Sequence, residues 1–233
     1  MLLSIIIPTL NEAPHIALLI ESLRAMQNDA ISLEIIVSDG GSRDATAKLA
    51  RTAGAIVVEG AKGRGAQLNA GARVASGDAL WFLHADAKPH PRSATHIARC
   101  LQNSAICGGN FRLRFAGGGW AANVFARIAR QQRRMGIYYG DSGIWTRRAV
   151  FDSLGGFADW PLFEDYDFAR RLESFAQRHT FRTDYASCAL VASPRRFHKA
   201  PLRILAQWLL LQMLFSLGAS PQRLAEFYHR GKM

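Results

Sequence analysis

The chain has 233 residues, of which 49% are hydrophobic and 20% charged, so it is long and apolar enough to bury a substantial core. Its net charge is +11, and the excess lies mainly in residues 117–233 (17 basic and 9 acidic, net +8) rather than in residues 1–116 (12 and 9, net +3). Such a positive field can attract diphosphates, anionic lipid surfaces or nucleic acid, or can simply belong to a solvated surface.

The ends and the cysteines give further expectations. Residues 1–8 have neither a basic region nor a small-residue cleavage site, so a strand is expected there rather than a signal peptide. Cys100, Cys107 and Cys188 are odd in number and lack the spacing of a metal site. This pattern argues against a disulfide framework and favours a reduced, cytosolic setting.

The first half alternates buried-strand and helical patterns. Strands are predicted at 3–8, 33–38, 55–58 and 79–83, with helices between them at 16–23, 43–53 and 66–75. Strands separated by helices of this length imply a parallel sheet with right-handed crossovers, whose ligands bind outside the carboxyl ends of the strands. We therefore expect the polar clusters that follow those ends to meet in one crevice: 9–12, 39–44, 62–64 and 84–86.

The second half is less regular. Strands are predicted at 110–115, 143–146 and 180–191, and helices at 123–134 and 164–177. Residues 204–217 are almost continuously apolar, but a membrane span needs about 20 residues, so a core or interfacial helix is expected. The sequence shows no repeat or long linker. We expect a single domain with three parts, 1–116, 117–200 and 201–233.

Two carboxylates at strand ends can carry chemistry. Asp86 can hold a divalent cation that also grips two phosphate groups, or it can cap the proline-containing turn that follows. Asp39, followed by two glycines, can accept hydrogen bonds from a base or ribose, or it can belong to an ordinary strand–helix turn. The glycine-rich segment 63–71 lacks both the G-x-G-x-x-G spacing and the P-loop lysine, which argues against hydride transfer and P-loop phosphoryl transfer.

A third acidic group begins the helix predicted at 164–177. Glu164 and Asp165 could serve as favourable charges at the positive end of the helix dipole. Alternatively, the apolar residues 160–163 before them could raise a carboxyl pKa towards the range of a general base. The residues alone do not separate these interpretations.

Taken together, these motifs resemble family 2 of the glycosyltransferases. Four segments occur in the order of that family: S-I-I-I-P-T-L-N-E at 4–12, I-I-V-S-D-G-G-S-R-D at 35–44, L-H-A-D at 83–86, and G-G-F followed by E-D at 155–165. The resemblance covers about residues 1–180 and is strongest to the radical-SAM/selenodomain-associated transferases. It implies a GT-A fold, an α/β Rossmann-like mixed (mostly parallel) sheet with helices on both faces, here with a C-terminal helical segment.

The resemblance also implies roles for single residues. Asp165 matches the acid of the E-D motif, the catalytic base of inverting members, and Glu164 stands beside it. Asp86 matches the last acid of the D-x-D signature, which ligates Mn²⁺ or Mg²⁺. The implied donor-binding residues are Pro8, Thr9, Asn11, Glu12, Asp39, Gly41, Arg64, His84 and Asp86.

Two features depart from the family pattern. His84 stands in the place of the first acid of D-x-D, so we expect weaker metal binding or a contact through water. The Q-x-x-R-W motif is absent, which argues against a processive polysaccharide synthase. Arg195 and Arg196 could supply diphosphate contacts instead, or could form a basic edge that leads into the apolar helix. Tyr139 and Asp141 could shape the acceptor pocket.

The predicted reaction is a metal-dependent, inverting transfer of a hexose-like unit from a nucleoside-diphosphate sugar to an acceptor hydroxyl. Uridine is the favoured nucleoside of the donor. The sequence leaves open a lipid-linked acceptor, a peripheral membrane contact and a homodimer, and no nucleic-acid partner is expected. One alternative is a nucleotidyltransferase, which predicts a glycine- and arginine-rich loop in place of residues 8–12. Another is a basic protein that binds nucleic acid or a membrane surface, which explains the charge but not the polar clusters.

Overall fold

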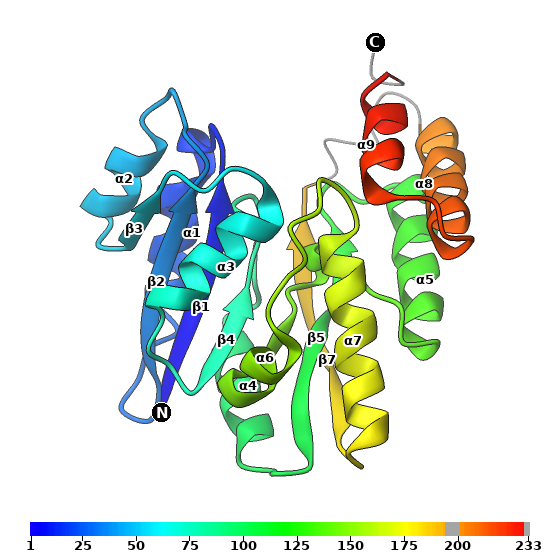
Figure 1. Cartoon of the computed structure of the whole chain (residues 1–233). Helices are drawn as coiled ribbons and strands as arrows, with labels where there is room; N and C mark the ends of the chain where they lie inside the picture. Colours follow the sequence, from blue (N-terminus) through cyan, green and yellow to red (C-terminus); the bar gives the residue numbers. More distant parts are fainter. Residues whose placement is uncertain (194–200, 231–233) are drawn as a thin grey trace.

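The computed structural model describes residues 1–193 and 201–230, and their strands form one seven-stranded sheet (Figure 1). The strand order is β3-β2-β1-β4-β6-β5-β7. β6 runs antiparallel to β4 and β5, while the other neighbouring strands are parallel. The strands are β1 (Leu2–Thr9), β2 (Ser32–Asp39), β3 (Ile56–Glu59), β4 (Ala79–Phe82), β5 (Ile106–Phe115), β6 (Trp145–Arg147) and β7 (Arg182–Ala192).

Helices cover both faces of this sheet (Figure 1). Helices α1, α2 and α4 pack on one face, and α3, α6 and α7 on the other. The helices are α1 (Ala13–Arg24), α2 (Thr46–Thr52), α3 (Arg64–Val74), α4 (Ser93–Leu101), α5 (Trp120–Arg134), α6 (Arg148–Leu154), α7 (Glu164–Arg178), α8 (Pro201–Ser216) and α9 (Pro221–Arg230), with a 3-10 turn η1 (Gly140–Ser142).

The central strands are apolar throughout because both of their faces are buried. Ile5 and Ile7 of β1 belong to the core under α1, α2 and α4, whereas Ile6 belongs to the core under α3, α6 and α7. Helix α3 approaches β1 very closely. A Cβ at Gly71 would stand 2.5 Å from Ile6 Cγ2, so glycine is required there.

The predicted mixed, mostly parallel sheet with helices on both faces is confirmed. The helix predicted at 43–53 begins only at Thr46, because the Asp44 carboxylate accepts hydrogen bonds from Thr46 and from the N–H of Ala13 (3.2 Å), holding this segment as a loop. β5 begins at Ile106, before the predicted 110. Gly108 and Gly109 interrupt the strand pattern in the sequence, so the start of β5 was missed. Both glycines lie against the backbone of a neighbouring strand. The pattern also missed α4, α6 and α9.

The apolar segment 204–217 lies mostly within α8. Leu211, 1% exposed, packs with Phe163 and Tyr166 at the start of α7 and with Leu224 of α9. Other apolar side chains of this helix are exposed, among them Leu202, Leu210 and Met213. None of the described helices is long and apolar enough to cross a membrane. Strands from parts 1–116 and 117–200 share the one sheet, and the predicted division into three parts stays a prediction.

Candidate active site

The loops after β1 and β2 are locked together. Asn11, whose φ of 55° suits asparagine, accepts a hydrogen bond from the N–H of Arg43 (2.9 Å) and donates its own N–H to Ser42 Oγ (2.8 Å). The N–H of Glu12 donates to Thr46 Oγ1 (2.8 Å). The two predicted donor-binding loops therefore form one rigid unit at the carboxyl edge of the sheet.

Asp39 organises this unit from within. Its buried carboxylate accepts hydrogen bonds from Thr9 Oγ1 (2.9 Å), from the N–H (2.7 Å) and Oγ (2.6 Å) of Ser42, and from the N–H of Gly41 (3.1 Å). Burial raises the pKa of Asp39, but these hydrogen bonds outweigh burial and leave the pKa below its usual value. In this structure the side chain thus fixes the loop as an ionised acceptor.

Gln67 of α3 is a site residue that the sequence did not reveal. Its Nε2 donates to the carbonyl oxygens of Thr9 (2.8 Å) and Ser38 (2.7 Å), the ends of β1 and β2. A Cβ at Gly40 would stand 3.1 Å from this amide. The available signal was a polar residue on the small-residue face of the helix predicted at 66–75.

Arg64, the first residue of α3, joins the carboxyl edge of the sheet, the predicted donor edge, to the start of α7. Its Nε donates to Glu164 Oε1, and its Nη2 lies 3.2 Å from Asp165 Oδ2. Glu164 is 1% exposed and Asp165 5%, whereas the Arg64 side chain keeps 30% of its surface exposed. One partly accessible guanidinium therefore pairs with two buried carboxylates.

The two carboxylates of the E-D motif differ in acidity. Burial and the neighbouring Asp165 raise the pKa of Glu164 against the opposing effect of Arg64. Burial also raises the pKa of Asp165, but Arg64, the N–H of Gly140 (2.9 Å) and His84 outweigh burial and lower it. A raised carboxyl pKa was one of the two interpretations that the sequence left open. It holds for Glu164 but not for Asp165, because the arginine and the backbone donors stabilise the charged form of Asp165.

His84 and Asp165 meet around Gly140 of η1. A Cβ at Gly140 would stand 3.1 Å from His84 Nε2 and 3.0 Å from Asp165 Oδ2. The residue in the first D-x-D position and the acid of the E-D motif, far apart in sequence, thus face one small space. The buried Asn110 donates to Ser142 Oγ (3.0 Å) and accepts from Arg133 Nε (2.6 Å), which fixes η1 from behind.

These groups open onto a cavity of ≈ 520 Å³. Its lining includes many of the predicted residues: Pro8, Thr9, Glu12, Arg64, His84, Asp86, Tyr139, Asp141 and Asp165. Asn11, Asp39, Gly41 and Glu164 are not among the described lining residues and lie behind it or beside it. Arg195 and Arg196 lie outside the described residues. Residues from three of the four clusters that were expected to meet in one crevice, 9–12, 62–64 and 84–86, thus line this cavity.

The wall of the cavity formed by α5 and α8 is mostly apolar and aromatic, with Gln132, Arg133 and Gln212 as its polar members, and the sequence did not predict it. Helix α5 contributes Phe125 and Ile128, and α8 contributes Leu205, Trp208 and Leu209. Tyr139 stacks on Tyr166 (5.6 Å between ring centroids) and meets Trp208 edge to face (6.0 Å). Polar donor-side groups and an apolar wall therefore share one cavity.

Residues 4–154 match the sequence profile described as Glycosyl transferase family 2. The chain belongs to this family. The match spans the β1, β2 and β4 segments that shape the donor edge, and it confirms the predicted enzyme class at the level of the family. The narrower resemblance to the radical-SAM/selenodomain-associated transferases stays a prediction.

Similar proteins include Glycosyltransferase AglE of Haloferax volcanii, 24% identical over 199 residues, 79% of this chain and 66% of AglE. This chain thus spans just under two thirds of AglE. The mannosyltransferase PcManGT of Pyrobaculum calidifontis, solved with GDP-Man and Mn²⁺, superimposes with a TM-score of 0.69 (21% identity, 97% of this chain, 68% of that one). Glucosyl-3-phosphoglycerate synthase of Mycobacterium tuberculosis, solved with Mn²⁺, UDP-Glc and phosphoglyceric acid, gives 0.65 (22% identity, 91% and 78%). These likenesses confirm the GT-A fold.

Proposed function

We propose that this member of family 2 transfers a sugar from a nucleoside-diphosphate sugar to an acceptor hydroxyl with inversion, and that Asp165 is the base. The observation that carries the proposal is the position of the Asp165 carboxylate, at the cavity surface and beside His84 of the donor edge. Its lowered pKa keeps it ionised at neutral pH, so it is ready to accept the proton of the attacking hydroxyl.

The Arg64 pair holds this base in place. With Nη2 on Asp165 Oδ2 and Nε on Glu164, the guanidinium fixes the carboxylate against rotation. The N–H groups of Gly140 (2.9 Å) and Tyr166 (2.7 Å) hold the two oxygens from other directions. The acceptor oxygen forms its bond to the anomeric carbon as its proton passes to Asp165, and the diphosphate leaves from the opposite side, which inverts that carbon.

The donor side suits a divalent cation. Asp86 and Asp141 offer carboxylates and His84 an imidazole to the same cavity, a donor set that fits Mn²⁺ better than Mg²⁺ because imidazole favours transition metals. An ion bound there would neutralise charge on the departing diphosphate. Arg64 also lines the cavity, but its charge already pairs with Glu164 and Asp165, so the ion would supply the net positive charge.

The acceptor side suits a molecule with an apolar part. Phe125, Ile128, Leu205 and Trp208 form a wall that a sugar phosphate alone would leave uncovered, whereas a lipid-linked acceptor would bury it. Exposed Leu202, Leu210 and Met213 of α8 lie outside this wall and suit contact with a membrane surface, where the acceptor would reside. Arg203 on the same helix would strengthen docking to anionic lipid.

The donor is identified by thermal unfolding with uridine and guanosine diphosphates and their sugars, with and without Mn²⁺. A ligand at one hundred times its Kd adds about 2.7 kcal/mol to the free energy of unfolding, a clear shift in Tm. Proton NMR of the anomeric centre of the product then shows retention or inversion. A retained configuration, or the absence of any nucleotide effect, would contradict the proposal.

Vesicle flotation tests the acceptor side. The wild-type chain is expected to float with anionic but not neutral vesicles, and Met213→Glu should weaken flotation. Leu18→Glu, at an apolar position on α1 that is also exposed, is the matched control. The proposed membrane contact is contradicted if the chain floats with neither vesicle type, or if it forms a dimer that covers α8.

The family match favours sugar transfer over nucleotidyl transfer. A salt-sensitive complex with DNA, without nucleotide-sugar binding, would favour the nucleic-acid alternative.

A further inference from the structure

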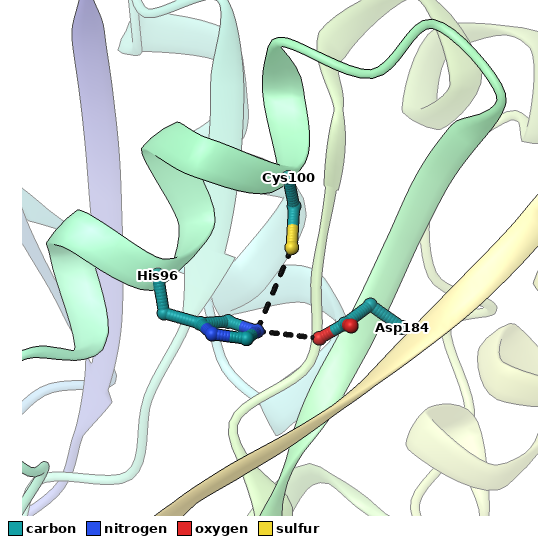
Figure 2. A group of neighbouring side chains, drawn as sticks. All are labelled: His96, Cys100 and Asp184. Carbon is teal, nitrogen blue, oxygen red and sulfur yellow. Dashed lines mark hydrogen bonds and ion pairs between the residues drawn. The ribbon is translucent and has the colours of Figure 1, made fainter.

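A second cluster of chemically active side chains lies away from the cavity, where α4 passes β7 (Figure 2). His96 Nε2 is 2.6 Å from Asp184 Oδ2 and 3.5 Å from Cys100 Sγ. One ligand atom from each of the three residues lies within 4.8 Å of the others. His96 and Cys100 stand one helical turn apart, so both point from one face of α4 towards β7 (Figure 2).

The cluster is separate from the cavity. None of His96, Cys100 and Asp184 is among the described residues that line it. Successive side chains of a strand alternate between the two faces of a sheet, and Asp184 reaches α4 while its neighbour Tyr185 lines the cavity. Cys100 is 7% exposed, and the His96 and Asp184 side chains keep 23% and 22% of their surface exposed. Solvent ions can therefore reach the cluster without entering the cavity.

Both sides of the cluster are rigidly held. A Cβ at Gly109 of β5 would stand 2.3 Å from the carbonyl oxygen of Asp184, so β5 and β7 touch at this point. The same carbonyl accepts a hydrogen bond from Arg133 Nη2 (3.2 Å), and Arg133 in turn pairs with Glu173 (3.1 Å). On the other side, Cys100 itself is packed in the core with Ile97 of α4. The three ligand atoms thus keep their places without any ligand.

We propose that His96, Cys100 and Asp184 form a binding site for a borderline transition-metal ion, best suited to Zn²⁺. Imidazole nitrogen, thiolate sulfur and carboxylate oxygen are the ligands that zinc prefers. With Zn–N of about 2.0 Å and Zn–S of about 2.3 Å, a tetrahedral site places N and S roughly 3.5 Å apart. The observed His96–Cys100 separation is 3.5 Å. The carboxylate must move back by less than about 1 Å, and water completes the fourth position.

Metal binding here would replace protons. Zn²⁺ needs a neutral imidazole and a thiolate, so the proton shared by His96 and Asp184 and the thiol proton of Cys100 both leave for solvent. The product ties α4 to β7, the last strand of the sheet, which has a neighbour on one side only. The site would therefore clamp a sheet edge, separately from the cation of the donor site, where no cysteine is among the described lining residues.

The test uses the full chain, reduced and freed of metal, titrated with Co²⁺ and then Zn²⁺. A cobalt–thiolate bond gives a charge-transfer absorption that a carboxylate site such as that of Asp86 cannot produce. We expect one equivalent of Co²⁺ with this absorption, displaced by Zn²⁺, and a rise in Tm with either ion. Cys100→Ser should abolish the absorption, and Asp184→Asn should weaken Zn²⁺ binding at least tenfold.

Cys188→Ser is the matched control, because Cys188 is a free cysteine on the same strand β7. This variant should keep the absorption and the affinity. Unfolding curves without metal establish that each variant is folded, and His96→Asn replaces any variant that is not. The proposal is overturned if the wild-type chain shows no cobalt–thiolate absorption, if Cys100→Ser keeps it, or if Cys188→Ser loses it.

Discussion

Arg64 Nη2 lies 3.2 Å from Asp165 Oδ2, although the two residues are 101 positions apart in the chain. This contact joins the first turn of α3, on the donor edge, to the first turn of α7. Because the same guanidinium also pairs with Glu164, any change in the charge of Arg64 alters both carboxylates of the E-D motif. The first two predictions follow from this arrangement.

Asp165→Asn should leave donor affinity near that of the wild type and lower kcat by roughly two to four orders of magnitude, as the loss of a general base does. The amide keeps the shape and can still accept the N–H of Gly140. Calorimetry with the nucleotide and steady-state kinetics separate the two effects. Asp167→Asn, on the same turn of α7 but paired with Arg171, is the control and should stay active. If Asp165→Asn keeps full activity while Glu164→Gln has none, Glu164 is the base instead of Asp165.

Arg64→Gln should move the acidic limb of the pH–rate profile to higher pH. Arg64 lowers the pKa of Asp165, so its removal lets burial raise that pKa, and the base becomes protonated at a pH where the wild type is still active. The measurement is kcat against pH, with Arg73→Gln at the other end of α3 as the control. A limb that stays in place would show that another group accepts the proton.

Asp86→Ala should abolish the Mn²⁺-dependent part of donor binding while leaving Tm nearly unchanged, because the side chain is half-buried at the cavity surface and belongs to neither sheet core. Calorimetry with the nucleoside diphosphate, with and without Mn²⁺, measures this dependence. Asp29→Ala, at an exposed turn, should behave as the wild type. If Asp86→Ala shows the same Mn²⁺ dependence as the wild type, other residues must hold the cation.

Gly140→Ala should lower kcat more than tenfold with a smaller effect on the Kd of the donor. The new methyl group would stand 3.0 Å from Asp165 Oδ2 and 3.1 Å from His84 Nε2, so it separates these side chains or displaces η1. Kinetics and nucleotide titration on the same preparation check the difference. Unchanged turnover would show that the reaction tolerates a wider gap between the two side chains.

The fold was predictable because the buried strands repeat apolar residues on both faces, as Ile5, Ile6 and Ile7 do. The motif residues Arg64, His84, Asp86 and Asp165 were predictable too, since each directly follows a strand or begins a helix in a family pattern. The meeting of His84 with Asp165 around Gly140 was not, because it depends on the turn before β6. Sequence patterns describe local chain geometry, and this contact is entirely tertiary.

Other parts of the site left weaker signals. Gln67 is buried in α3, where its side-chain amide donates to two carbonyl oxygens. No local sequence pattern indicates that these carbonyl groups lie beside it. The apolar wall from α5 and α8 depends on how two helices from distant parts of the chain pack together. His96 and Cys100 stood at helical spacing, but α4 itself was not predicted, and Asp184 comes from a strand 88 positions after His96.

The reversed direction of β6 has a consequence for how recognition is divided along the chain. In a wholly parallel sheet only residues that follow strands arrive at the carboxyl edge, whereas an antiparallel strand begins there. The predicted donor-binding residues Glu12 and Asp86 come after β1 and β4, but η1 comes just before β6. Insertions upstream of that strand can thus remodel the pocket beside Tyr139 while every donor loop stays untouched. If Tyr139 shapes the acceptor pocket as predicted, the acceptor can therefore change without any change in the loops that follow β1 and β4.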